Sequence, residues 1–125
     1  MGILVNGKWT NDPQPPSDGR FARPESRFRH HVTADGTAAT GGFKAESGRY
    51  HLYVAYNCPW AHRAMIFRTL KGLESMVSMS IALPNDRING WRFGNTYPGS
   101  TPDDVNGFTW LHQAYSAAEI GRAHV

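Results

Sequence analysis

The most regular alternation of apolar and polar positions lies in residues 50–56, a segment rich in aromatic and β-branched side chains. This pattern predicts a strand with two distinct faces. One face carries Leu52 and Val54, and the other carries His51, Tyr53 and Ala55. Pro59 cannot continue a central strand but suits the first position of a helix. We therefore expect the strand to pass into a helix at this proline.

A helix is predicted over residues 60–71, because small and apolar residues recur there at helical spacing. We expect one face to hold Ala61, Ala64, Met65 and Leu70, with His62, Arg63, Thr69 and Lys71 mostly opposite. Gly72 follows as a natural C-terminal stop. Residues 76–83 alternate again and predict a second strand. Strand, helix and strand in close succession predict an α/β fold with a βαβ core and parallel strands.

The flanking segments are rich in turn-forming residues. Within residues 1–48, residues 3–9 contain an Asn-Gly pair and predict a small hairpin, whereas the rest reads as a long irregular arm. After Pro84 the chain is again loop-like, and residues 108–116 could start another helix. We therefore divide the chain into an N-terminal arm, 1–48, and a partial domain, 49–118.

Composition narrows the possible function. The 125 residues leave room for one domain with a modest core, and the net charge of +3 lacks the clustered basic stripe of a nucleic-acid-binding protein. A single cysteine rules out an internal disulfide. The sequence shows no signal-peptide pattern at its N-terminus and no apolar run of the ~20 residues that span a bilayer. We expect a protein of the cytoplasm, outside membranes.

Cys58 is the candidate catalytic residue. It lies where the predicted strand meets a helix that starts with proline, so free N–H groups and the positive end of the helix dipole face the sulfur. Both stabilise the thiolate, which is the attacking species in thiol–disulfide exchange. Ala61 occupies the place of the second cysteine in the usual redox motif, so an external thiol would have to resolve a mixed disulfide.

Two other interpretations of Cys58 remain open at this point. A lone cysteine in a folded protein is often a small buried apolar residue without chemistry. A metal site would need Cys58 with His62 and the pair His30 and His31, but this spacing matches no known ligand set. We therefore expect no bound metal.

Several motifs in order resemble one family. Residues 58–63 read Cys-Pro-Trp-Ala-His-Arg, and residues 70–74 read Leu-Lys-Gly-Leu-Glu. Together with 21–29, 89–93 and 107–115, they resemble the glutathionyl-hydroquinone reductases, the Xi class of glutathione transferases. The resemblance implies an incomplete thioredoxin-like domain, the N-terminal domain of a glutathione transferase.

The resemblance also implies a mechanism. Cys58 would attack the sulfur of a glutathionyl-hydroquinone, release the hydroquinone and hold glutathione as a mixed disulfide. A second glutathione would then free Cys58 and leave as glutathione disulfide. Trp91 matches the tryptophan that packs against bound glutathione, and Pro59 and Trp60 would shape the helix start at the glutathione site. Glutathione would be a co-substrate, no metal would take part, and the full-length protein would be a homodimer. His62 and Arg63 are not expected to be catalytic.

The chain also departs from the family. A complete member continues with a further strand and an all-helical C-terminal domain, which we expect to be absent here. Residues 119–125 do not resemble the family, and one codon choice for them reproduces a common sequencing-library adapter. We interpret them as a non-native tail, so Arg122 should not be taken for a glutathione-binding arginine.

Three alternatives to this function remain. The chain could belong to a dehydroascorbate reductase or to a glutaredoxin-like deglutathionylase, which share the chemistry at sulfur. It could also be a non-catalytic fragment with an inert Cys58. We expect the 125-residue fragment by itself to have little activity, because its apolar face would lack the cover of the helical domain.

Overall fold

A computed structural model describes residues 2–11, 18–20 and 29–118. Two predicted segments lie outside the described residues: most of the aromatic and basic motif at 21–29, and the tail at 119–125. Within the described ranges, no helix has the length and apolar character needed to cross a membrane.

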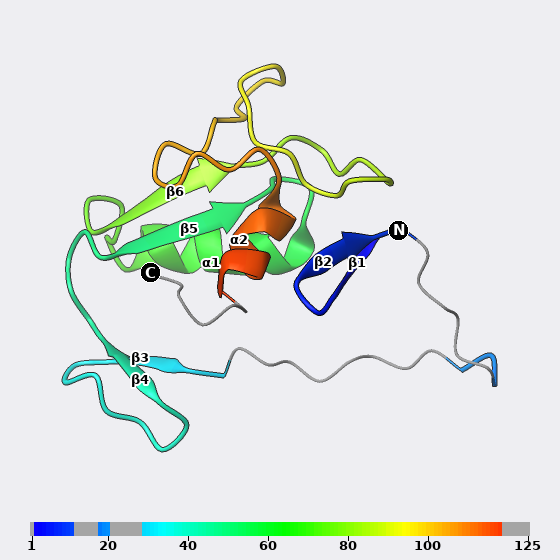
Figure 1. Ribbon diagram of the computed structural model, residues 1–125. Helices are drawn as coiled ribbons and strands as arrows, with labels where there is room; N and C mark the ends of the chain where they lie inside the picture. Colours follow the sequence, from blue (N-terminus) through cyan, green and yellow to red (C-terminus); the bar gives the residue numbers. More distant parts are fainter. Residues whose placement is uncertain (1, 12–17, 21–28, 119–125) are drawn as a thin grey trace.

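The central unit is the predicted βαβ arrangement (Figure 1). Strand β5 (Tyr50–Val54) leads into helix α1 (Pro59–Leu70), which is followed by strand β6 (Val77–Ile81). The two strands pair in parallel, with Tyr50 opposite Val77 and Val54 opposite Ile81. Each predicted element is confirmed, with ends that differ from the prediction by at most two residues.

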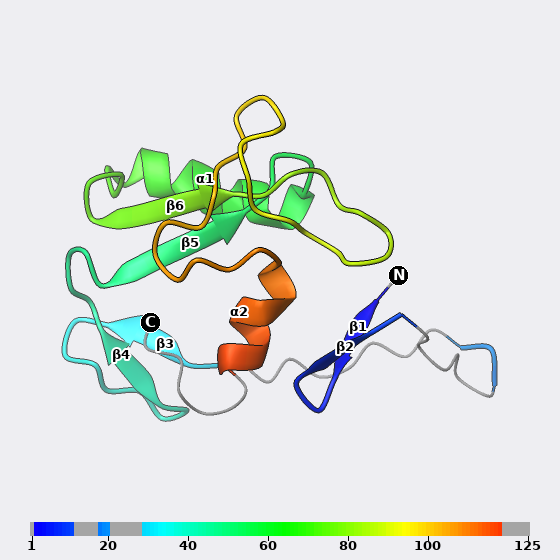
Figure 2. The ribbon, with the colours of Figure 1, turned by 45° about the horizontal axis from the view of Figure 1, so that its top comes forward.

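The two faces of the β5–β6 sheet are covered differently. Helix α1 lies on one face, while helix α2 (Leu111–Ala117) and the segment before it lie on the other (Figures 1 and 2). On this second face the core consists of Ala55, Ala82 and Phe93, each at most 5% exposed. Phe93 comes from the segment after β6, so this segment must fold back across the sheet to form the core.

The burial of α1 corrects part of the sequence prediction. Its half-buried residues are Ala61, Met65 and Arg68, whereas Ala64 is exposed and Leu70 is 74% exposed. Leu70 follows Ala61 by a helical rotation of about 180°, so the two cannot share one face. Arg68 lies on the sheet-facing side instead. Its guanidinium donates to the carbonyl oxygens of Val77 and Glu74, at 2.7 and 3.0 Å.

The N-terminal hairpin is confirmed. Strands β1 (Ile3–Val5) and β2 (Lys8–Thr10) pair antiparallel around the turn at Asn6 and Gly7. These turn residues have φ values of 50° and 74°. Positive φ at both central positions is the requirement of a type I′ turn, which Asn-Gly meets at little cost.

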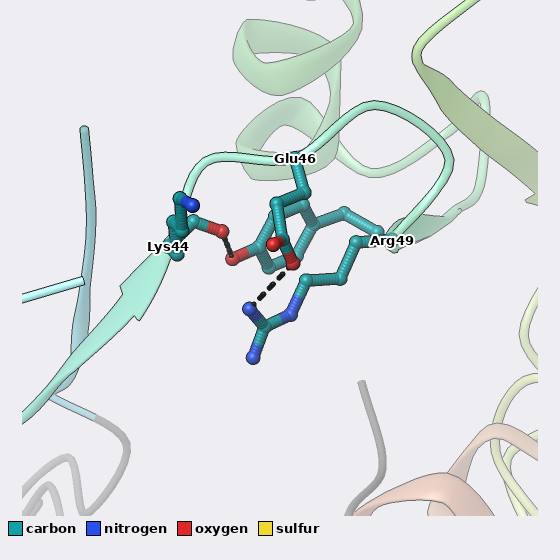
Figure 3. Close-up of polar contacts among 4 residues, drawn as sticks. Lys44, Glu46 and Arg49 are labelled. Atoms are coloured by element: carbon teal, nitrogen blue, oxygen red, sulfur yellow. Dashed lines mark hydrogen bonds and ion pairs between the residues drawn. The ribbon is translucent and has the colours of Figure 1, made fainter. Parts of the chain in front are cut away.

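A second strand pair in the arm was not predicted. Strands β3 (His31–Thr33) and β4 (Gly42–Lys44) pair in parallel, so residues 1–48 are less irregular than the sequence indicated. After β4 the chain is held to β5 by local contacts. Arg49 forms an ion pair with Glu46 at 2.9 Å, and the Tyr50 hydroxyl donates to the carbonyl oxygen of Lys44 (Figure 3).

Helix α2 starts three residues later than the predicted segment 108–116. The side chain of Gln113 explains this start, because its carbonyl oxygen accepts the N–H groups of Thr109 and Trp110 at 2.9 and 2.8 Å. These contacts cap donors that would otherwise lack a partner before the first helical turn. Two backbone hydrogen bonds, from Leu111 to Trp91 and from Phe93 to Thr109, both at 2.8 Å, join this helix start to the segment after β6.

Candidate active site

Cys58 is the N-cap residue of α1, as the sequence predicted. Its backbone is extended, with φ −96° and ψ 110°, and its carbonyl oxygen accepts the N–H of His62 at 3.1 Å. Its own N–H donates to the carbonyl oxygen of Ala55 at 3.1 Å, which makes a tight turn between β5 and α1. The backbone of Cys58 is therefore held at the junction on both sides.

The helix start leaves donors near the Cys58 side chain. Pro59 occupies the first helical position, and no side chain caps the helix. The N–H groups of Trp60 and Ala61 therefore lie in the first turn, where a helix offers them no internal acceptor. An N-cap side chain can accept such N–H groups, and the helix dipole favours negative charge there. The predicted thiolate at Cys58 stays a prediction.

Pro59 and Trp60 follow Cys58 in the first turn of α1. Both are exposed, and the Trp60 ring is 65% exposed with the Arg63 guanidinium 5.3 Å from its centroid. Their predicted contribution to glutathione binding stays a prediction. Their backbone role is visible, since the proline ring fixes the φ angle with which α1 begins.

Trp91 lies on the same core cluster as Cys58. Both side chains are half-buried and pack against the cluster of Ala55, Ala82 and Phe93. The Trp91 carbonyl oxygen accepts the N–H of Leu111 at 2.8 Å, which ties the residue to the start of α2. The fold thus brings together a candidate nucleophile and an aromatic ring that come from different segments.

A polar cluster on the same sheet face was missed at the level of sequence. His51 contacts two serine hydroxyls, Ser78 through Nδ1 at 2.6 Å and Ser80 through Nε2 at 2.8 Å. Burial lowers the pKa of His51 below its ordinary value, although Asp103 and Asp104 act in the opposite direction. The imidazole is therefore neutral near pH 7. The alternation of each strand predicted which face its side chains lie on, but it could not predict that His51 contacts the two serines across the sheet.

Asp103 is the second member of this cluster. It is only 5% exposed, and its carboxylate accepts the Tyr53 hydroxyl at 3.0 Å and the N–H groups of Val105, Asn106 and Phe108, each at 3.1 Å. Burial alone would raise the pKa of Asp103, but these hydrogen bonds outweigh it and the pKa lies below its ordinary value. Burial also raises the pKa of Tyr53. Asp103 therefore carries a charge that holds the loop to β5.

The metal interpretation has no geometric support in the described part of the chain. No group of three or more histidine, cysteine, aspartate or glutamate side chains there could hold an ion. His62 is exposed on α1, and His30 packs edge-on against Phe43 at 5.4 Å.

Known proteins similar to this chain share its motifs and its fold. No family model matches the sequence. The glutathionyl-hydroquinone reductase YqjG of Escherichia coli is 44% identical over 124 residues, which cover 95% of this chain and 38% of YqjG. A Xi-class glutathione transferase from Natrialba magadii has a TM-score of 0.77 at 41% identity, over 94% of this chain and 34% of that chain.

The glutathione-bound structure of YqjG also matches, with a TM-score of 0.61 and 49% identity over 67% of this chain and 28% of that chain. The chain thus spans little more than a third of the length of these relatives. Their shared fold has a thioredoxin-like N-terminal domain, which the βαβ unit matches. By sequence and by fold, the chain is related to the glutathionyl-hydroquinone reductases and the Xi-class glutathione transferases, and the resemblance predicted from its motifs is confirmed.

Proposed function

We propose that the protein reduces glutathionyl-hydroquinones to hydroquinones, with glutathione as co-substrate and Cys58 as nucleophile. The position of Cys58 supports this most directly: it is the N-cap of a proline-started helix and contacts the same core cluster as Trp91. The similarity to glutathionyl-hydroquinone reductases supplies the substrate class.

In the first step, the Cys58 thiolate attacks the sulfur of the glutathionyl group. A sulfur–sulfur bond forms and the bond between sulfur and the aromatic carbon breaks. That carbon takes the electron pair and a proton, so the hydroquinone leaves in reduced form. In the second step, the thiolate of another glutathione attacks the mixed disulfide and leaves as glutathione disulfide. For each carbon–sulfur bond that is reduced, one glutathione thiol and the former thioether sulfur are oxidised to the disulfide, and the Cys58 thiolate is released.

The start of α1 and Trp91 contribute to the proposed site in different ways. The N–H groups of Trp60 and Ala61 lie where they stabilise negative charge on the attacking sulfur. The Trp91 ring offers a flat surface for the glutathione backbone, and Pro59 and Trp60 form the adjoining edge. In this arrangement the second cysteine of a redox pair is not needed, because Ala61 occupies its position and glutathione resolves the disulfide.

The proposal is tested by mass spectrometry of the full-length protein that contains this chain, after incubation with glutathionyl-menadiol. We expect release of menadiol and one glutathione adduct on Cys58, which added glutathione removes. Cys58→Ser should abolish both, whereas His62→Ala alters the first turn of α1 and should leave adduct formation intact. An adduct without release of menadiol would overturn the proposed reaction.

The substrate class is tested by competition. Dehydroascorbate and a glutathionylated peptide share the mixed-disulfide step and differ in the leaving group. A preference for either over glutathionyl-menadiol would assign the protein to another type of cysteine-dependent glutathione transferase. In cells, we place the proposed reaction in the cytoplasm, where glutathione is abundant and reduced, and we expect the full-length protein to be a homodimer.

A further inference from the structure

The N-terminal hairpin reaches the loop that presents Trp91. The indole Nε1 of Trp9 donates to the carbonyl oxygen of Ile88 at 2.9 Å, across 79 positions of sequence. The Trp9 ring also lies over Gly90, whose φ is +83° and where an added Cβ would meet the ring at 3.2 Å. Gly90 directly precedes Trp91, so Trp9 contacts the loop at two positions, one of them next to Trp91.

The same tryptophan contacts helix α2. Its ring stacks on the His112 ring, with centroids 4.8 Å apart and planes 13° apart. The Ser116 hydroxyl of α2 donates to the carbonyl oxygen of Gly7 in the hairpin turn at 2.7 Å, which holds the hairpin beside α2 (Figure 2). Since α2 begins with the hydrogen bond from Leu111 to Trp91, Trp9 supports Trp91 from this side as well.

The loop is also held from within, because the Asp86 carboxylate accepts the N–H groups of Ile88 and Asn89 at 2.6 and 2.8 Å. Residues 86–90 close on themselves through the paired backbone hydrogen bonds between Asp86 and Gly90, both at 2.8 Å. Between the hairpin, this loop and α2 lies a cavity of about 340 Å³, and Trp9 and Trp91 both line it. A segment beside a cavity lacks packing partners there, so the contacts with Trp9 bear on where the loop lies relative to α2.

We propose that Trp9 is a positioning residue for the glutathione site: it wedges the 86–90 loop against α2 and so fixes the place of the Trp91 ring. This inference rests on the proposed function, because Trp91 is taken to pack against glutathione. Trp9 does not itself touch the ligand. Its effect reaches glutathione only through the loop and through the backbone of Trp91.

The test compares Trp9→Phe, Trp9→Ala and the control Lys8→Ala in the 125-residue chain. Phenylalanine keeps a ring on His112 and loses the indole N–H, whereas alanine loses both contacts; Lys8 is an exposed neighbour on β2. Hydrogen exchange of the Asp86 and Gly90 amides reports closure of the loop without any ligand. Titration with S-methylglutathione, followed by the indole N–H signal of Trp91, reports binding.

We expect faster amide exchange and about fivefold weaker binding in Trp9→Phe, the factor expected for one neutral hydrogen bond. Trp9→Ala should show a larger change, Lys8→Ala none, and alkylation of Cys58 by iodoacetamide should keep its rate in all variants. Unchanged loop exchange, or unchanged binding in Trp9→Ala, overturns the inference. If the unaltered chain does not bind S-methylglutathione, glutathione binding as proposed fails, while the exchange data still decide whether Trp9 holds the loop.

Discussion

Replacing Asp103 by asparagine tests whether one buried carboxylate holds the sheet to the loop that follows it. Its Oδ1 accepts the N–H groups of Val105 and Asn106, and its Oδ2 accepts Tyr53 and Phe108. In Asp103→Asn, the new amide can keep one pair of bonds through its oxygen. Its NH₂ group then faces the N–H of Phe108, so two donors meet and neither is satisfied.

The magnitude follows from these contacts. A buried donor without a partner costs about 1–3 kcal/mol, and the retained bonds also lose the strength that a charged acceptor gives. We expect the free energy of unfolding to fall by about 3 kcal/mol. With an m-value of about 2 kcal/mol/M for a chain of this size, the urea midpoint should drop by roughly 1.5 M. Asp104→Asn is the matched control, because Asp104 is exposed and loses the same charge.

The pH dependence gives a second check. Because the pKa of folded Asp103 lies below its ordinary 3.8, the ionised carboxylate contributes its stability above that value. This contribution is lost as the pH falls through the lower pKa of the folded state, so the difference between the two proteins should shrink only below about pH 4. A midpoint shift equal to that of Asp104→Asn, or a shift under about 0.3 M, would refute the reasoning.

Three further predictions follow from other contacts. Burial lowers the pKa of His51, so the contribution of its neutral ring to the free energy of unfolding should be full above about pH 6.5 and fall as the pH drops. Between about pH 7.5 and 5.5, the urea midpoint of His51→Gln should therefore change less than that of the unaltered chain. Gly90→Ala should cost about 1 kcal/mol more than Gly107→Ala in urea unfolding, because both glycines have positive φ but only Gly90 touches another side chain; equal costs would disprove the contact with Trp9. Leu70→Glu should reduce self-association, measured by light scattering, without lowering the urea midpoint. Thr69→Glu, at an exposed neighbour, should reduce self-association less.

The central unit could be predicted because its signals are local. The period-two alternation of β5 and β6, the proline that opens α1 and the glycine that follows it each fix an element within its own residues. The strands β3 and β4 could not be predicted in this way. Each has only three residues, and β4 starts within a Gly-Gly pair that indicates a turn.

In the candidate site, too, the features with a local sequence signal could be predicted and the others could not. The position of Cys58 at the helix start was predicted from Pro59, a local signal that the structure confirms, whereas the chemistry of Cys58 stays a prediction. The polar cluster around Asp103 was missed because the residues near it indicate turns, and nothing local relates them to Tyr53, 50 positions earlier. Trp91 was singled out only through the family resemblance, since no pattern in the sequence places it beside Cys58.

The topology supplies the physical reason why Cys58 and Trp91 pack against the same core cluster. Cys58 follows the carboxyl end of β5, and the segment that carries Trp91 follows the carboxyl end of β6. In a parallel pair these ends lie at the same edge of the sheet, which is where α/β folds bind ligands. Phe93 then packs against Ala55 and Ala82, and this cluster receives both side chains. A change within the core should therefore disturb Cys58 and Trp91 together, whereas a change at Trp9 should displace Trp91 alone, so alkylation and binding measured on the same variant separate the two effects.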